Sequence, residues 1–102
     1  MYNIFTVTTV RDPIKCNHPT GYPRTVGWFS QYETAHDCVS ENWGDIYEEG
    51  YYRFAVIEEF PSGIYQHRIN EWWYEWDIDQ GKYILLKETP DYFFQIANFG
   101  IG

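Results

Sequence analysis

Residues 25–43 read TVGWFSQYETAHDCVSENW, and this stretch decides the fold. Residues 25–29 form a short apolar run that predicts a strand. Ser30 and Glu33 follow as a capping box, in which the serine hydroxyl caps the first turn and the glutamate reaches back. A helix is therefore predicted over about 31–43. The positions that form its apolar face at helical spacing are Tyr32, Ala35, Val39, Trp43 and Ile46.

Strand-like runs lie on both sides of this helix. Residues 2–10 and 51–60 are rich in β-branched and aromatic side chains. Turn signals at 61–63 and 79–81 predict two hairpins, which join 51–60 to 64–69 and 72–78 to 82–87. Thr89 and Pro90 predict the start of a short C-terminal helix over 91–97, and the apolar tail 99–102 is expected to fold back onto the sheet.

These elements predict one α+β domain spanning 1–102. The expected architecture is a single antiparallel or mixed sheet of about five to six strands, with one main helix and a short C-terminal helix. No repeat, low-complexity tract or domain boundary interrupts the chain.

The charge balance limits the classes of partner. Fifteen acidic and seven basic residues give a formal charge of -8, which disfavours binding to nucleic acid or to an anionic membrane. No apolar run approaches the roughly 20 residues of a membrane span, and residues 1–5 lack the features of a signal peptide. A cytoplasmic protein without a cofactor is the resulting expectation.

Residues with catalytic or metal-binding potential are present but poorly arranged. Cys16, His18, His36 and Cys38 supply the stoichiometry of a zinc site. However, His36 and Cys38 lie about 200° apart around a helix, so they cannot face one metal. No glycine-rich phosphate loop or serine nucleophile motif occurs. We therefore predict no catalytic, cofactor-binding or metal-binding residues, and a protein that is not an enzyme.

Glu58 is a separate case, because it shares a strand face with Phe54, Val56 and Phe60. A carboxyl group in apolar surroundings has a raised pKa, as general acids do. A structural ion pair with Arg53 or Arg68 explains such a position equally, and this structural interpretation is favoured.

Residues 71–77, EWWYEWD, are the densest feature of the sequence. As a strand, they place Trp72, Tyr74 and Trp76 on a core face. The opposite face combines an indole with carboxylates, which suits a basic partner or a cation over the ring. We expect at least one exposed indole here. The predicted partner-binding residues are Glu71, Trp73, Glu75 and Asp77.

Residues 11–24 form a long connection marked by Pro13, Pro19, Gly21 and Pro23. It is either a functional loop or a tolerated surface insertion. Its three basic residues could give a nucleotide-like ligand the local positive charge that the acidic chain otherwise lacks. The alternative ligand-binding residues are Arg11, Lys15 and Arg24.

Two segments, VGWFSxxExA over 26–35 and YxFAVIEE over 52–59, resemble small bacterial and phage-borne accessory proteins. In those proteins a strand runs into a capped helix and a second strand follows. Some of them antagonise host defence, anti-CRISPR proteins among them. The resemblance to anti-CRISPR proteins is one of size and charge only, and it transfers no functional residues.

The leading hypothesis is a non-enzymatic binding or inhibitory module whose acidic, aromatic surface engages a basic protein. The alternatives are a small-ligand protein that stacks a nucleotide-like ring, and a structural domain whose aromatic residues are all core. Surplus aromatic residues and an edge strand also make a homodimer an expectation.

Overall fold

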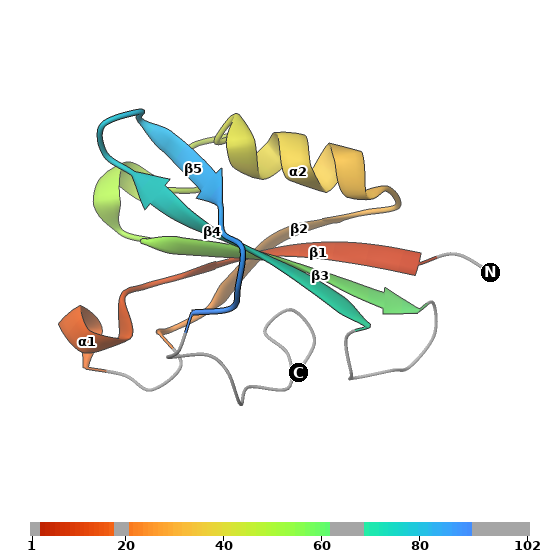
Figure 1. Cartoon of the computed structure of the whole chain (residues 1–102), viewed down its shortest axis with the longest axis horizontal. Helices are drawn as coiled ribbons and strands as arrows, with labels where there is room; N and C mark the ends of the chain where they lie inside the picture. Colours follow the sequence, from red (N-terminus) through yellow and green to blue (C-terminus); the bar gives the residue numbers. More distant parts are fainter. Residues whose placement is uncertain (1–2, 18–20, 62–68, 91–102) are drawn as a thin grey trace.

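The computed structural model describes residues 3–17, 21–61 and 69–90. Its centre is a five-stranded antiparallel sheet in the order β2-β1-β3-β4-β5 (Figure 1). The strands are β1 (Asn3–Val10), β2 (Arg24–Phe29), β3 (Phe54–Pro61), β4 (Asn70–Asp77) and β5 (Lys82–Leu85). Helix α2 (Tyr32–Ser40) covers one face, and a short helix α1 (Pro13–Cys16) and a 3-10 turn η1 (Glu48–Gly50) lie in the connections. The predicted α+β class with one main helix is confirmed.

The strand pairing corrects one predicted hairpin. β3 lies between β1 and β4, with Val56 opposite both Thr8 and Trp73. The hairpin partner of β3 is therefore β4, and the pairing extends to Ile69, whose N–H donates to the Glu59 carbonyl at 2.8 Å. The hairpin between β4 and β5 is confirmed, with Gly81 in the left-handed region at φ +67°. The predicted strand over 64–69, except Ile69, lies outside the described residues, as do the helix over 91–97 and the tail.

Helix α2 begins and ends differently from the prediction. Its N-cap is Gln31, which makes no side-chain capping bond, so the Ser30–Glu33 capping box does not form. The helix ends at Ser40 because Asn42 turns into the left-handed region. Trp43 therefore leaves the apolar face and is 41% exposed, whereas Ala35, Val39 and Ile46 are buried as expected.

A large core fills the space between α2 and the sheet. Val7, Ile57 and Tyr74 are fully buried there, with Trp72 and Trp76 packed beside them. Burial raises the pKa of Tyr74, which is hydrogen bonded to Tyr32 and to His36 Nδ1 at 3.1 and 2.6 Å. The predicted core face of β4 is thereby confirmed.

The opposite face of the sheet is buried as well. Val10, Phe54, Val56 and Trp73 form a second cluster, and Trp73 is only 2% exposed. The expectation of an exposed indole in β4 is therefore wrong, because it assumed that one face of the sheet meets solvent. The exposed indoles belong instead to Trp28 at 66% and Trp43 at 41%.

Candidate functional site

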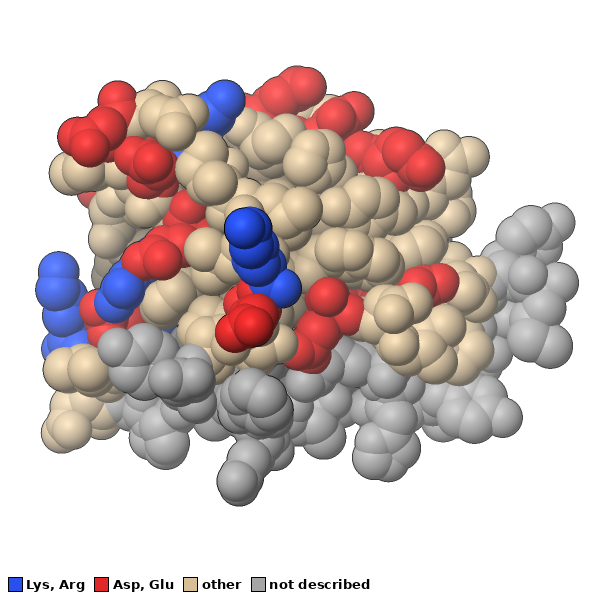
Figure 2. Space-filling model, viewed as in Figure 1, with Lys and Arg blue, Asp and Glu red and all other residues tan. Residues whose placement is uncertain are grey.

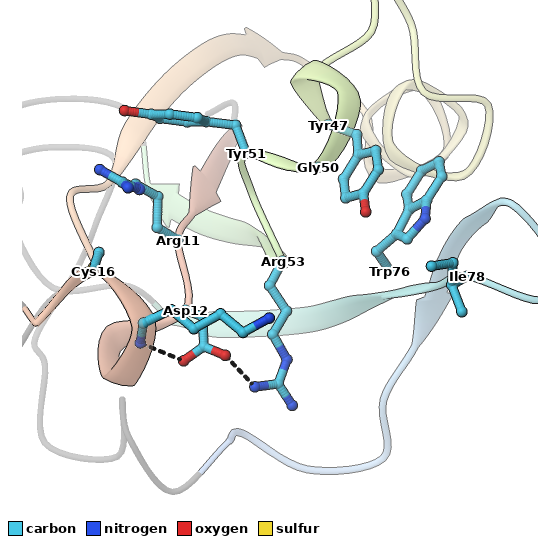
Figure 3. A pocket seen from close by; sticks show the side chains of 10 residues that line it. Arg11, Asp12, Cys16, Tyr47, Gly50, Tyr51, Arg53, Trp76 and Ile78 are labelled. Atoms are coloured by element: carbon cyan, nitrogen blue, oxygen red, sulfur yellow. Dashed lines mark hydrogen bonds and ion pairs between the residues drawn. The ribbon is translucent and has the colours of Figure 1, made fainter.

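A hollow of about 290 Å³ lies between α1 and the end of the sheet (Figure 3). We call it the cationic hollow, because three of the seven Lys and Arg residues in the chain line it. Its main lining residues are Arg11, Lys15, Arg53, Tyr47, Tyr51 and Trp76. The sequence predicted Arg11, Lys15 and Arg24 as ligand-binding residues, and the structure brings the first two together here.

Helix α1 positions Lys15 and one wall of the hollow. Asp12 caps this short helix by accepting from the backbone N–H groups of Ile14 and Lys15, at 3.0 and 3.4 Å. Pro13 occupies the first helical position, where its missing N–H costs nothing. Asn17 ends the helix in the left-handed conformation, at φ 54°.

The loop that carries α1 is closed at its base. The Arg11 N–H donates to the Gly21 carbonyl at 2.7 Å. Gly21 has φ +70°, and a Cβ there would lie 2.5 Å from both the Arg11 carbonyl oxygen and Val10 Cγ1. Only glycine fits this position. The hydrogen bond between Arg11 and Gly21 holds the backbone of Arg11 in place.

Arg53 joins α1 to the sheet through two ion pairs. Its Nη1 lies 2.7 Å from Asp12 Oδ2, and its Nη2 lies 2.7 Å from Glu75 Oε2. Burial opposes ionisation of Asp12, but hydrogen bonds from Arg53 and from the α1 backbone outweigh it and hold the pKa of Asp12 below its usual value. The same two carboxylates raise the pKa of Arg53 despite its partial burial. Arg53 is thus protonated, and its positive charge is already balanced by the carboxylates of Asp12 and Glu75.

Arg11 and Lys15 supply the surplus positive charge. Within the described residues, no ion pair includes either of them. The Arg11 guanidinium lies over the Tyr51 ring, 4.3 Å from its centroid, and 5.5 Å from that of Tyr22. These cation–π contacts orient the guanidinium and leave its N–H groups able to bind an anion.

An aromatic wall stands opposite Arg11 in Figure 3. Tyr47 and Trp76 stack with their ring centroids 3.7 Å apart and their planes 7° from parallel. Tyr83 meets both rings edge-on, and Ile78 is 84% exposed beside Trp76. The hollow therefore combines cations on one side with flat apolar surface on the other.

Arg24 does not belong to this hollow. It forms an ion pair with Glu48, and both residues line a second hollow beside β2. Sequence reasoning missed Arg53, Tyr51 and Trp76 as lining residues. The partners of Arg53 come from positions 12 and 75, and no short motif connects residues so far apart.

The four predicted partner-binding residues each have a structural role. Trp73 is buried against Phe54, and Glu75 pairs with Arg53. Asp77 Oδ1 accepts from the N–H groups of the following turn, at 2.9 and 3.2 Å. Glu71 accepts a hydrogen bond from Thr89. The indole at the centre of the expected surface is in the core, whereas Glu71, Glu75 and Asp77 are half-buried.

Two of the remaining candidates, Glu58 and Cys38, are buried. Glu58 is fully buried, and Arg53 pairs with Asp12 and Glu75. Arg68 and His18 lie outside the described residues. Cys38 is 5% exposed and packs in the main core, where burial raises the pKa of its thiol. In the part of the chain that the structure describes, no group of three His, Cys, Asp or Glu side chains could hold a metal.

The chain matches no protein-family model, and no curated protein or solved structure is significantly similar to it. The helices described here also include none that is long and apolar enough to cross a membrane.

Proposed function

We propose that this protein binds a small anionic molecule with a flat ring, such as a mononucleotide, in the cationic hollow. The observation that carries the proposal is the placement of Arg11, Lys15 and Arg53 around one hollow in a chain of net charge -8. An acidic protein repels anions at long range, so an anion site requires such a local concentration of positive charge.

The three cations have different roles in this proposal. Arg53 holds Asp12 and so fixes α1. Arg11 and Lys15, whose charges are not neutralised by an ion pair within the described residues, bind the anionic group. A planar guanidinium and a flexible ammonium together are a common combination for a phosphate.

The flat ring of the ligand packs on the apolar side of the hollow. Tyr51 is 50% exposed and the stacked pair of Tyr47 and Trp76 lines the opposite wall. The volume of about 290 Å³ is close to the lower end of the range for small-molecule sites, about 300–1,000 Å³. It accommodates a ligand no larger than a mononucleotide, with part of that ligand in solvent.

The test uses Cys16, which lines the hollow, as an internal reporter. Iodoacetamide should alkylate Cys16 and spare Cys38, which is buried. Ribonucleoside monophosphates and inorganic phosphate, added separately, should slow the alkylation of Cys16, and nucleotides should also change tryptophan fluorescence. Protection by phosphate alone measures the contribution of the anionic group to binding. Protection by a nucleoside, which lacks the phosphate, measures the contribution of the ring.

Variants separate this site from general charge effects. Arg11→Ala and Lys15→Ala should each weaken nucleotide binding by about tenfold, the usual worth of a charged hydrogen bond. Lys87→Ala, an exposed lysine outside the hollow, is the matched control and should bind like the unmodified chain. The proposal fails if millimolar nucleotide neither protects Cys16 nor changes fluorescence, or if all three variants lose affinity equally.

The hypothesis of a basic protein partner is independent of this site. It stays a prediction, and the surface expected for it is not formed by Glu71, Trp73, Glu75 and Asp77.

A further inference from the structure

The outer edge of β2 has no strand beside it among the described residues. β2 pairs with β1 on one side and is the terminal strand of the sheet. β2 begins at the charged Arg24 and has an irregularity at Val26, where its register with β1 shifts. Its residues 25–29 otherwise contain no charged residue and no proline, which are among the usual devices that protect an edge. Thr25 and Trp28 are exposed along it. Such an edge is a template on which an extended segment can add as a further strand.

A second hollow, of about 380 Å³, lies beside this edge. We call it the acidic hollow, and it is formed by Arg24 and Val26 of β2 and by Trp43, Asp45 and Glu48 after α2. The Trp43 indole is held in place, because its Nε1–H donates to Glu41 Oε1 at 2.9 Å and its ring meets Phe29 edge-on. Its remaining surface is open to solvent.

The charge around this hollow is negative. Glu41, Asp45 and Glu48 are all exposed, and Arg24 neutralises only Glu48. Two more exposed acids, Glu33 and Asp37, continue along α2, and Figure 2 shows acidic side chains on that side of the molecule. A cation over an indole with carboxylates beside it is a favourable arrangement for a lysine or arginine side chain.

The segment 42–50 holds the acidic hollow in a defined shape. Asn42, Asp45, Glu48 and Glu49 all have φ between 51° and 55°, which is uncommon for residues other than glycine. The Asn42 side chain stabilises the turn, because Oδ1 accepts from the Tyr47 N–H at 2.9 Å and Nδ2 donates to Asp45 Oδ1 at 3.0 Å. The carboxylate of Asp45 is therefore fixed at the mouth of the hollow.

We propose that the outer edge of β2 binds an extended, basic segment of another protein as an added strand. One lysine or arginine of that segment lies over Trp43 beside Asp45, and a neighbouring side chain packs on Trp28. A second copy of this chain fits less well, because the acids around the edge repel their equivalents in a chain of net charge -8. This inference does not depend on the proposed ligand site.

The test measures binding of fluorescent ten-residue peptides to the full chain by anisotropy. The probe alternates lysine with valine. One control peptide replaces every lysine with glutamate, and another is N-methylated at every second residue, which removes backbone donors and keeps the charge. We expect the basic peptide to bind, with affinity falling as salt rises, and both control peptides to bind at least tenfold more weakly.

Protein variants locate the site. Trp43→Ala should weaken peptide binding about tenfold, and Asp45→Asn, which keeps the left-handed backbone, should weaken it three- to tenfold. Asp79→Asn, an exposed acid in the β4–β5 turn, should have no effect. Circular dichroism checks that each variant is folded.

Three outcomes would overturn the inference. One is the absence of peptide binding at millimolar concentration. Another is equal binding of the N-methylated peptide, which would show charge attraction without strand addition. The third is sedimentation showing a dimer that the basic peptide cannot dissociate, which would make a second copy the occupant.

Discussion

The cationic hollow and the acidic hollow both take part of their lining from residues 43–51 but carry opposite charge. Tyr47, Gly50 and Tyr51 line the first, whereas Trp43, Asp45 and Glu48 line the second. Each hollow contains an arginine paired with a carboxylate. In the cationic hollow the surplus charges are Arg11 and Lys15, and in the acidic hollow they are carboxylates. A net charge of -8 therefore says little about the ligand at any one place on this molecule.

The two ion pairs also differ in burial. Arg53 is 40% exposed and binds a nearly buried Asp12 together with Glu75, whereas Arg24 and Glu48 are 55% and 41% exposed. Charge pairs contribute more to stability as water is excluded from them. The ion pairs of Arg53 in the cationic hollow should therefore stabilise the fold, whereas the pair in the acidic hollow should contribute almost nothing to the free energy of unfolding.

Arg53→Met gives the largest expected effect. It leaves Asp12 and Glu75 without their shared cation, so the free energy of unfolding should fall by about 2–3 kcal/mol at pH 7. Urea denaturation measures this loss. A loss below about 1 kcal/mol would contradict a structural role for Arg53 and remove the contrast between the two hollows.

Asp12→Asn gives an intermediate effect with a defined pH dependence. The substitution removes charge from the pair with Arg53 and from the α1 cap, so stability at pH 7 should fall by about 1–2 kcal/mol. The pKa of Asp12 is below its ordinary value of 3.8 in the folded chain, so its ionisation stabilises the fold above that pH. This stabilisation is lost as the pH falls through the folded pKa.

Urea denaturation of both proteins from pH 7 to pH 2 tests that dependence. The stability gap between the original chain and Asp12→Asn should be constant above about pH 5 and should narrow below pH 3.8. A gap that widens in acid would show that Asp12 is not stabilised in its charged form.

Arg24→Met gives the smallest expected effect. Exposed ion pairs contribute about 0–1 kcal/mol, so unfolding by urea should change by less than about 0.5 kcal/mol, and added salt should remove even that. A larger, salt-resistant loss would show that the acidic hollow depends on its ion pair as the cationic hollow does.

Local patterns in the sequence predicted the strands and the main helix well. Alternation placed Tyr74 on the core face of its strand, and the spacing in α2 placed Ala35 and Val39 in the core. The capping box failed because Gln31, one residue after the serine, is the N-cap. A local pattern predicts that a helix starts but leaves the first residue uncertain by one or two positions.

The candidate sites depended on long-range contacts, which a local pattern does not contain. Trp73 was expected to be exposed because alternation separates the two faces of a strand but does not show whether both are covered. Its burial depends on Val10 and Phe54, which are distant in sequence. Likewise, Arg11, Lys15 and Arg24 were predicted together from their proximity in the sequence. Arg24 lies in the other hollow, whereas Arg53 and Trp76 join Arg11 and Lys15 only through the sheet.

The hydrogen bond between Arg11 and Gly21 closes the loop that contains α1, between β1 and β2, at its base. Because the loop leaves and returns at one hydrogen-bonded point, the strands on either side are sensitive to its two ends and not to its length. The entropic cost of closing a loop grows only slowly with added residues. A change of loop length that keeps Asp12, whose carboxylate pairs with Arg53, should therefore leave the register between β1 and β2 intact.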